Sequence, residues 1–180
     1  MLTPSPDILI RRLEPTDDRS TFQSGNIELD RYFQLYAGQN QFRHHLSSNY
    51  VALRGNNILG FTTVSIGQLE RQNLPVEDTK NLPAYGLPVL RLARLAVAQQ
   101  TQGQGIGLRL MAAVFSLAHR LATDVGCVGV MVDAKPEARD FYLKLGFRTM
   151  ELTRGQLGDR PQPVAMFLNL KRIPLEATPS

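Results

Sequence analysis

The sequence predicts a mixed α/β protein in which helices cover the faces of one sheet. Segments of strand length and of helical periodicity follow one another in the order β-α-β-β-β-α-β-α-β-β, and neither an internal repeat nor a low-complexity tract interrupts them. The composition, with 43% hydrophobic and 20% charged residues, is that of an ordinary globular chain. A length of 180 residues suits one layered domain.

The first half of the chain predicts three strands and one helix. Residues 8–13 form the first strand, and Asn26 caps the helix that follows. The apolar face of this helix comprises Leu29, Tyr32, Phe33 and Tyr36. Residues 50–53 and 58–66 flank a turn at 55–57 and predict a β-hairpin. The apolar residues of 67–87 follow neither the helical nor the strand periodicity, which predicts an extended surface connection.

The second half predicts two further strand-helix units and two final strands. Residues 89–97 read as a buried central strand, and residues 105–123 as a long amphipathic helix. A buried strand at 127–132 precedes a helix that begins near Pro136 and ends at a left-handed Gly146. Ala138, Phe141, Tyr142 and Leu145 share one face of that helix. The last two strands lie near residues 148–152 and 164–170.

Several classes of protein are disfavoured by the residues present. Cys127 is the single cysteine, so an intramolecular disulfide, a zinc cluster or a thiol pair is not expected. The histidines 44, 45 and 119 give no metal constellation, and His119 is expected at the helix surface. The start of the chain lacks the features of a signal peptide, and no later apolar run approaches membrane-spanning length. We therefore expect a soluble cytoplasmic protein without a membrane partner, with flexible termini at 1–7 and 172–180.

Positive charge is concentrated in one interval of the chain. The formal net charge is +4 and the pI is near 9.5. No Asp or Glu occurs between Asp78 and Asp124, and this interval contains Lys80, Arg91, Arg94, Arg109 and Arg120. An electropositive face that meets a polyanion is one expectation, although many proteins carry such a charge without one.

The segment from Gln100 to Gly107 is the candidate anion-binding motif of the chain. Its glycines lie between a strand and a helix, so backbone N–H groups can converge on an anion at the positive end of the helix dipole. A tight strand-to-helix connection without a ligand is the alternative. The sequence does not match a Walker loop, because no Lys-Ser or Lys-Thr follows, and three strands precede it, unlike in a dinucleotide-binding fingerprint.

The pattern Gln-x-x-Gly-x-Gly after Leu95-Ala96-Val97, followed by the segment 138–147, resembles the GCN5-related N-acetyltransferase (GNAT) family. The resemblance covers residues 8–171. It implies the GNAT fold, with a mostly antiparallel sheet of six to seven strands and about four helices. It also implies an N-acetyltransferase that uses acetyl-CoA and no metal.

The resemblance assigns roles to individual residues. The turn amides of Gln102, Gly103, Gln104, Gly105, Ile106 and Gly107 would hold the pyrophosphate, and the strand at Leu95, Ala96 and Val97 would pair with the pantetheine arm. Tyr142 would protonate the departing thiolate. A core tyrosine on an apolar helical face is the alternative.

A narrower resemblance concerns the acceptor. Residues 22–26 leading into 29–33, together with 93–97, look like the acetyltransferase toxins of bacterial toxin–antitoxin pairs, which acetylate the amino acid on charged tRNA. Ser24 stands where these toxins have Cys or Ser before the glycine. The implied partners are aminoacyl-tRNA and a ribbon-helix-helix antitoxin, and a homodimer is a further expectation.

The acceptor site is expected to use the arginines of the central strand. Arg91 and Arg94 would hold the acceptor end of tRNA, with the alternatives that they neutralise coenzyme phosphates or pair with distant carboxylates. Arg43, His44, His45 and Arg148 would extend this surface. An α-amino group needs less help from a base than lysine does, and Glu70 is a candidate base. The other functional readings are a non-toxic enzyme that acetylates a small-molecule or protein amine, and a non-catalytic coenzyme A-binding module.

Overall fold

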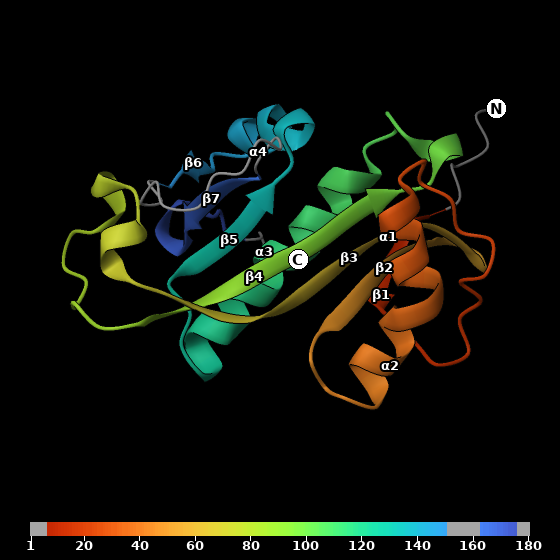
Figure 1. Cartoon of the computed structure of the whole chain (residues 1–180), viewed down its shortest axis with the longest axis horizontal. Coiled ribbons are helices and arrows are strands. Elements are labelled where there is room, and N and C mark those ends of the chain that lie inside the picture. The colour runs from red at the N-terminus through yellow and green to blue at the C-terminus, as the bar shows by residue number, and fades with distance from the viewer. Residues whose placement is uncertain (1–6, 151–162, 176–180) are drawn as a thin grey trace. The chain divides into compact units, whose positions relative to one another are not determined.

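The computed structural model describes residues 7–150 and 163–175. Within these residues, seven strands form one sheet in the order β1-β2-β3-β4-β5-β7-β6 (Figure 1). Strands β4 and β5 pair in parallel, whereas β1–β2, β2–β3, β5–β7 and β6–β7 are antiparallel. Four α-helices accompany the sheet in the described part of the chain. The predicted mixed, mostly antiparallel α/β class is therefore confirmed.

The chain forms two compact units. Unit 1 holds the described residues up to Ser65 together with Ala93–Val114, and unit 2 holds Ile66–Leu92 with the described residues from Phe115 onward. The elements of unit 1 are β1 (Leu9–Arg12), α1 (Ile27–Arg31), a π-helical turn (Tyr32–Tyr36), α2 (Ala37–Phe42), β2 (Ser48–Arg54), most of β3 (Asn57–Leu69), the end of β4 (Leu87–Val97), a 3-10 turn (Gln99–Thr101) and the start of α3 (Ile106–Asp124).

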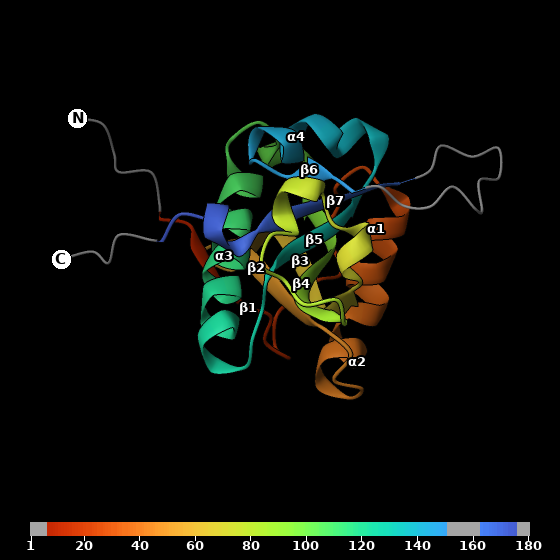
Figure 2. The ribbon, with the colours of Figure 1, turned by 90° about the vertical axis from the view of Figure 1, so that its left-hand side faces the viewer.

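Unit 1 has a helix layer on each face of its strands. Alternate residues of β2 point to opposite sides: Val51 packs with the Phe33 and Phe61 cluster, and Ala52 packs with Ile106 and Leu110 of α3. Figure 2 shows α1 and α3 on opposite sides of these strands. The Phe33 and Phe61 rings are stacked with centroids 4.1 Å apart, and both side chains are fully buried.

The first helical region departs from the predicted apolar face. Asn26 caps α1 as predicted, since its side chain accepts a hydrogen bond from the Leu29 N–H at 3.1 Å. Beyond it, the π-helical turn brings the Ala37 N–H onto the Tyr32 carbonyl, five residues back. This wider turn moves the buried face by one residue, so Ala37 is buried and Tyr36 is exposed. The placement of Tyr36 on the buried face was wrong.

The elements of unit 2 follow the predicted order with shifted boundaries. They are the end of β3, the 3-10 turns Arg71–Asn73 and Val76–Asp78, the start of β4, the end of α3, β5 (Gly129–Ala134), the 3-10 turn Pro136–Ala138, α4 (Arg139–Lys144), β6 (Arg148–Thr149), β7 (Val164–Asn169) and the 3-10 turn Leu170–Arg172. Strand β5 starts two residues later than predicted, because the Val128 N–H bonds the Pro88 carbonyl outside the ladder. Residues 151–152 of the predicted strand 148–152 lie outside the described residues.

The segment 67–87 is more ordered than an extended surface connection. Strand β3 continues to Leu69, and two 3-10 turns follow it. Leu74 packs with Leu69 and Leu87 in a hydrophobic cluster of unit 2, and Asp78 is also buried. The prediction was wrong because isolated apolar residues between prolines show no period, although tertiary packing buries them.

Strand β4 is buried at only some of its positions. Leu90, Leu92 and Ala96 are buried, whereas Arg91 and Ala93 are exposed. The predicted buried strand is therefore buried at only part of its length, with Arg91 exposed and Arg94 half-buried.

Helix α3 is amphipathic, as predicted. Its buried residues, Ile106, Leu110, Met111, Val114 and Ala118, recur at helical spacing. Its 19 residues include a window with mean hydropathy 1.2, which is long and apolar enough to cross a membrane by length and composition. The expectation that no run approaches that length was wrong by these measures. The exposed Arg109 and Arg120 and the buried opposite face are those of a helix packed on a protein core.

Candidate active site

The glycine-rich turn of unit 1 joins β4 to α3 through two left-handed glycines. Gly103 has a φ of +80° and Gly105 a φ of +82°. A Cβ added at either position would meet nothing within 4 Å. Glycine is thus required here by the backbone conformation and not by lack of space. Both residues are exposed, immediately before α3 begins at Ile106.

The turn presents several backbone N–H groups that bond no acceptor in the described part of the chain. Among the described residues, no hydrogen-bond acceptor is found for the N–H groups of Gly103, Gly105, Ile106 and Gly107. The Gln104 N–H, by contrast, bonds the Thr101 carbonyl at 3.3 Å. Free N–H groups at the start of a 19-residue helix attract an anion, because the helix dipole adds partial positive charge there. This arrangement suits a pyrophosphate, and we call residues 102–107 the cradle.

The cradle is fixed by side-chain hydrogen bonds from within unit 1. The Gln102 Nε2 donates to the Ser24 carbonyl at 2.8 Å and to the Val97 carbonyl at 3.1 Å. The Gln99 N–H donates to the Gln23 carbonyl at 2.9 Å. The loop before α1 therefore holds the turn in place, and Gln102 contributes its side chain as well as its backbone.

Ser24 is occupied by the start of α1. Its Oγ donates to Asp30 Oδ1 at 2.6 Å and accepts the Asn26 N–H at 3.2 Å. The Ser24 N–H also donates to Asp30 Oδ1, at 2.9 Å. These bonds give Ser24 a structural role, which is to order the loop whose carbonyl meets Gln102.

The strand residues predicted to contact the pantetheine arm follow the last residue of β4 that pairs with β5. The register runs from Leu90–Val130 to Leu92–Val132 and stops there. Leu95 and Val97 are half-buried and Ala96 is buried. The Val97 carbonyl already accepts a bond from Gln102. The roles of Leu95, Ala96 and Val97 in binding the coenzyme remain predictions.

The two arginines of β4 have different surroundings. Arg91, in unit 2, lies 3.2 Å from Asp133 Oδ2, and both side chains are largely exposed. This favours the alternative that Arg91 pairs with a distant carboxylate. Arg94, in unit 1, has its guanidinium 3.6 Å from the centroid of the Tyr32 ring, a cation–π contact. The sequence assigned Tyr32 only to packing, and no local pattern links it to Arg94.

Tyr142 belongs to α4 of unit 2 and is 4% exposed. Its ring packs edge-on against Phe141 and Phe147, with centroids 5.1 and 5.4 Å away. Burial raises the pKa of Tyr142 above the ordinary value for a phenol. Its hydroxyl makes no hydrogen bond to another described residue, and the role of Tyr142 as a proton donor stays a prediction. Gly146, with φ +97°, ends the helix as predicted.

The remaining predicted site residues are exposed or contact other protein groups. Glu70 is exposed just after β3, and Arg43, His44 and His45 are exposed after α2. Arg148 lies 3.8 Å from Asp78 and 3.9 Å from Glu77, so its charge is partly balanced. His119 is half-buried, not at the surface, with Nε2 3.0 Å from the Ile173 carbonyl. Within the described ranges, no three His, Cys, Asp or Glu residues group to hold a metal ion.

A cavity of about 440 Å³ adjoins the 3-10 turn before the cradle. Side-chain amides dominate its lining, from Gln23, Asn56, Asn57, Gln99 and Gln100, and Asp18 adds a carboxylate. None of the described residues that line it is a lysine or an arginine. A phosphate therefore fits the cradle better than this cavity.

Comparison with known proteins gives one consistent result. Residues 28–166 match the model of the acetyltransferase (GNAT) domain family. The chain is 31% identical over 138 residues to a tRNA-acetylating toxin of Mycobacterium tuberculosis, covering 76% of this chain and 82% of that protein.

Solved structures with a similar fold include toxins. AtaT in complex with acetyl-methionyl-tRNAfMet superposes with a TM-score of 0.80 at 27% identity, covering 93% of this chain and 97% of that one. A Tyr-to-Phe variant of KacT gives a TM-score of 0.80 at 26% identity, covering 92% and 96%.

Proposed function

Because this chain belongs to the GNAT acetyltransferase family, we propose that it transfers the acetyl group of acetyl-CoA to the α-amino group of aminoacyl-tRNA and thereby blocks translation. The main support for aminoacyl-tRNA as the acceptor is the match to a tRNA-acetylating toxin over 82% of that protein's length. AtaT, solved with acetyl-methionyl-tRNAfMet, supports the same class of acceptor.

The cradle supports the donor half of this proposal. Its free N–H groups at Gly103, Gly105, Ile106 and Gly107 fit the pyrophosphate of acetyl-CoA. A structural relative, AtaTR, was solved with acetyl-CoA bound. The chain supplies neutral backbone donors here, so binding does not need a metal ion.

The reaction needs little covalent help from the protein. The neutral amine nitrogen attacks the thioester carbonyl carbon, a C–N bond forms, the C–S bond breaks, and one proton passes from nitrogen to sulfur. At pH 7, roughly one α-amino group in ten is neutral, against roughly one lysine in 2,500. An α-amine acceptor therefore suits a site without an identified base.

Tyr142 is the proposed donor to the departing sulfur. Its raised pKa keeps the phenol protonated across the neutral range, so it offers a hydrogen bond whenever the thiolate develops. The same shift makes full proton transfer less favourable than from an exposed phenol. We therefore propose that Tyr142 stabilises the developing thiolate by a hydrogen bond to sulfur. The proton that the sulfur finally receives comes from the attacking amine.

The biological setting follows the relatives. AtaT has been solved with the C-terminus of the antitoxin AtaR, and an antitoxin is proposed for this chain too. A ribbon-helix-helix protein is the expected partner class. The proposed acetyltransferase domain covers residues 8–171, and its proposed place of action is the cytoplasm, where charged tRNA is found.

The test follows labelled acetyl groups. Purified protein is incubated with labelled acetyl-CoA and bulk aminoacyl-tRNA, beside free amino acids, polyamines and a lysine peptide. Label on the aminoacyl group is expected. Label confined to the other acceptors would establish the non-toxic enzyme instead, and acetyl-CoA binding without any transfer would establish a binding module.

A tyrosine pair tests the assigned role of Tyr142. Tyr142→Phe is expected to lower kcat at least tenfold and to leave acetyl-CoA binding intact, because only the hydroxyl is removed. Tyr85→Phe is the matched control, since Tyr85 is 70% exposed. Equal turnover by both variants would reject Tyr142 as the donor.

A further inference from the structure

Arg94 is a half-buried cation for which the described part of the chain supplies no anion. Its guanidinium makes neither a hydrogen bond nor an ion pair to the described residues, although Thr62 Oγ1 donates to its backbone carbonyl at 2.8 Å. Arg11, also half-buried, bonds Asp17, and Arg19 bonds the Phe33 carbonyl. Stacking on Tyr32 engages only the face of the guanidinium, so the N–H groups around its edge stay available.

Tyr32 is itself held by a buried polar group. Its hydroxyl donates to Asn49 Oδ1 at 3.2 Å, and Thr63 Oγ1 donates to the same oxygen at 2.7 Å. Asn49 is fully buried, and Tyr32 is 7% exposed. The ring under Arg94 therefore has a fixed position and orientation.

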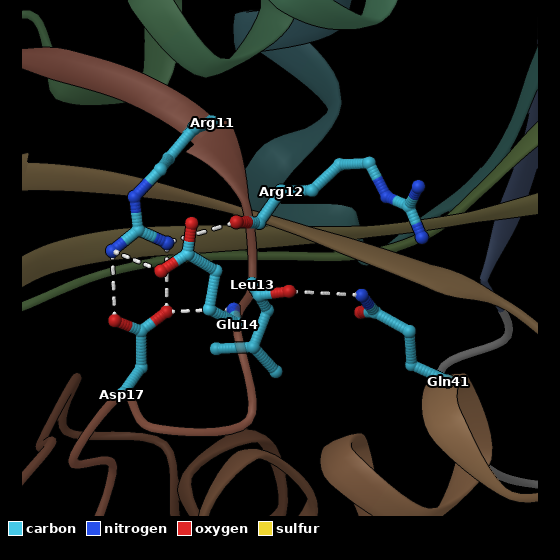
Figure 3. A network of polar contacts seen from close by, with 6 residues as sticks. All are labelled: Arg11, Arg12, Leu13, Glu14, Asp17 and Gln41. Atoms are coloured by element: carbon cyan, nitrogen blue, oxygen red, sulfur yellow. Dashed lines mark hydrogen bonds and ion pairs between the residues drawn. The ribbon is translucent and has the colours of Figure 1, made fainter.

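The other side of the Asn49 amide is satisfied too. Its Nδ2 donates to the Ala37 carbonyl at 3.2 Å and to Gln41 Oε1 at 3.1 Å. Gln41 Nε2 in turn donates to the Leu13 carbonyl at 3.0 Å, a bond visible in Figure 3. A network whose members are all satisfied favours one arrangement over others. Asn49, Gln41 and Thr63 are buried, so an effect of the network on binding has to pass through Tyr32.

Arg94 and the cradle belong to different faces of unit 1. Leu95 and Val97 pack with Ile106 and Leu110 of α3, whose first turn forms the cradle. Arg94 packs instead on Tyr32, which lies in the cluster with Phe33 on the other face. The coenzyme pyrophosphate already has donors in the cradle, so a second phosphate is the anion left for Arg94.

We propose that Tyr32 is a positioning residue that presents the Arg94 guanidinium to a phosphate of the tRNA acceptor end. The identity of this anion rests on the proposed function. A guanidinium held 3.6 Å from the ring centroid is restricted in orientation, and a restricted guanidinium favours bidentate contact with phosphate oxygens.

Kinetics with both substrates test the proposal. Arg94→Ala is expected to raise the KM for aminoacyl-tRNA roughly tenfold to a hundredfold and to leave the KM for acetyl-CoA unchanged. The slope of log affinity for uncharged tRNA against log salt is expected to shrink in magnitude by about 0.7–0.9, because one phosphate contact is lost. A structural defect alone would not change this slope.

Variants of Tyr32 test whether it acts through Arg94. Tyr32→Leu removes the stack and is expected to raise the KM for aminoacyl-tRNA, whereas Tyr32→Phe keeps the ring and is expected to stay closer to the unchanged protein. Combining Tyr32→Leu with Arg94→Ala is expected to be no worse than Arg94→Ala alone. Tyr36→Leu is the matched control, since Tyr36 is exposed in the same π-helical turn.

Separate outcomes overturn the inference and the proposed function. An Arg94→Ala effect on the KM for acetyl-CoA alone would assign the anion to the coenzyme, and additive effects in the double variant would show that Tyr32 does not act through Arg94. Either result overturns the inference while tRNA acetylation stands. Failure of the unchanged protein to acetylate any aminoacyl-tRNA overturns the proposed function. If Tyr32→Leu does not fold, Arg94→Lys serves as the test, because lysine keeps the positive charge but cannot stack on Tyr32 as a guanidinium does. An unchanged KM for aminoacyl-tRNA in Arg94→Lys would overturn the inference.

Discussion

Adding one methyl group to the cradle should separate backbone strain from ligand binding. Gly103→Ala and Gly105→Ala place a Cβ where no atom lies within 4 Å, so their cost to folding comes from the positive φ alone. A left-handed alanine costs about 1–2 kcal/mol. For a chain of this size that lowers Tm by roughly 2–8 °C. Gly55→Ala is a matched control, because Gly55 has a φ of +61°, is equally open, and belongs to the β2–β3 turn.

Binding should distinguish the three variants. Relief of the strain at Gly103 or Gly105 rotates neighbouring N–H groups away from the anion. Loss of one hydrogen bond to a charged group costs about 1.5–3 kcal/mol, which is roughly a 10- to 150-fold weaker Kd. Isothermal titration with acetyl-CoA measures this, and thermal unfolding measures the strain. Equal Kd values for the unchanged protein and all three variants, with equal losses of Tm, would refute the assignment of these N–H groups to the coenzyme.

Three further predictions concern stability. Hydrogen bonds from the Arg11 guanidinium hold the pKa of Asp17 below its usual value (Figure 3), so Asp17→Asn should lose about 1 kcal/mol at pH 7. This difference should begin to shrink as the pH falls below about 4 and vanish below the lowered pKa of Asp17, and chemical unfolding at several pH values measures it. Burial raises the pKa of Tyr142, so the contribution of Tyr142 to the free energy of unfolding should be complete below about pH 10 and decline above it. The Tyr142→Phe variant should lack this loss of stability at alkaline pH in the same assay. Phe33→Ala should cost about 3–5 kcal/mol in urea unfolding, whereas Leu35→Ala, at a 61% exposed position, should cost at most about 0.5 kcal/mol; similar losses would contradict the assigned core.

The order of the elements was predictable because it depends on short-range signals. Asn26 caps α1, Gly55 turns the hairpin and Gly146 ends α4, and each acts through its own φ or through a side chain that reaches three residues along the chain. The π-helical turn was not predictable in this way. It depends on Tyr32, Phe33 and Ala37 all reaching the sheet, which is a requirement of packing and not of local propensity.

The sequence by itself predicted a glycine-rich turn and the strand and helix that flank it, because glycines before a helix can adopt positive φ and leave backbone N–H groups free for an anion. Only the tertiary structure decided which groups far along the chain the charged and polar side chains meet. Arg91 reaches Asp133 across 42 residues, and Gln102 reaches the Ser24 carbonyl across 78. Periodicity does not encode contacts at such separations. The sequence favoured Arg94 over Arg91 for the acceptor site because Arg94 lies in the family-like strand, but only folding paired Arg91 with a carboxylate and placed Arg94 on Tyr32.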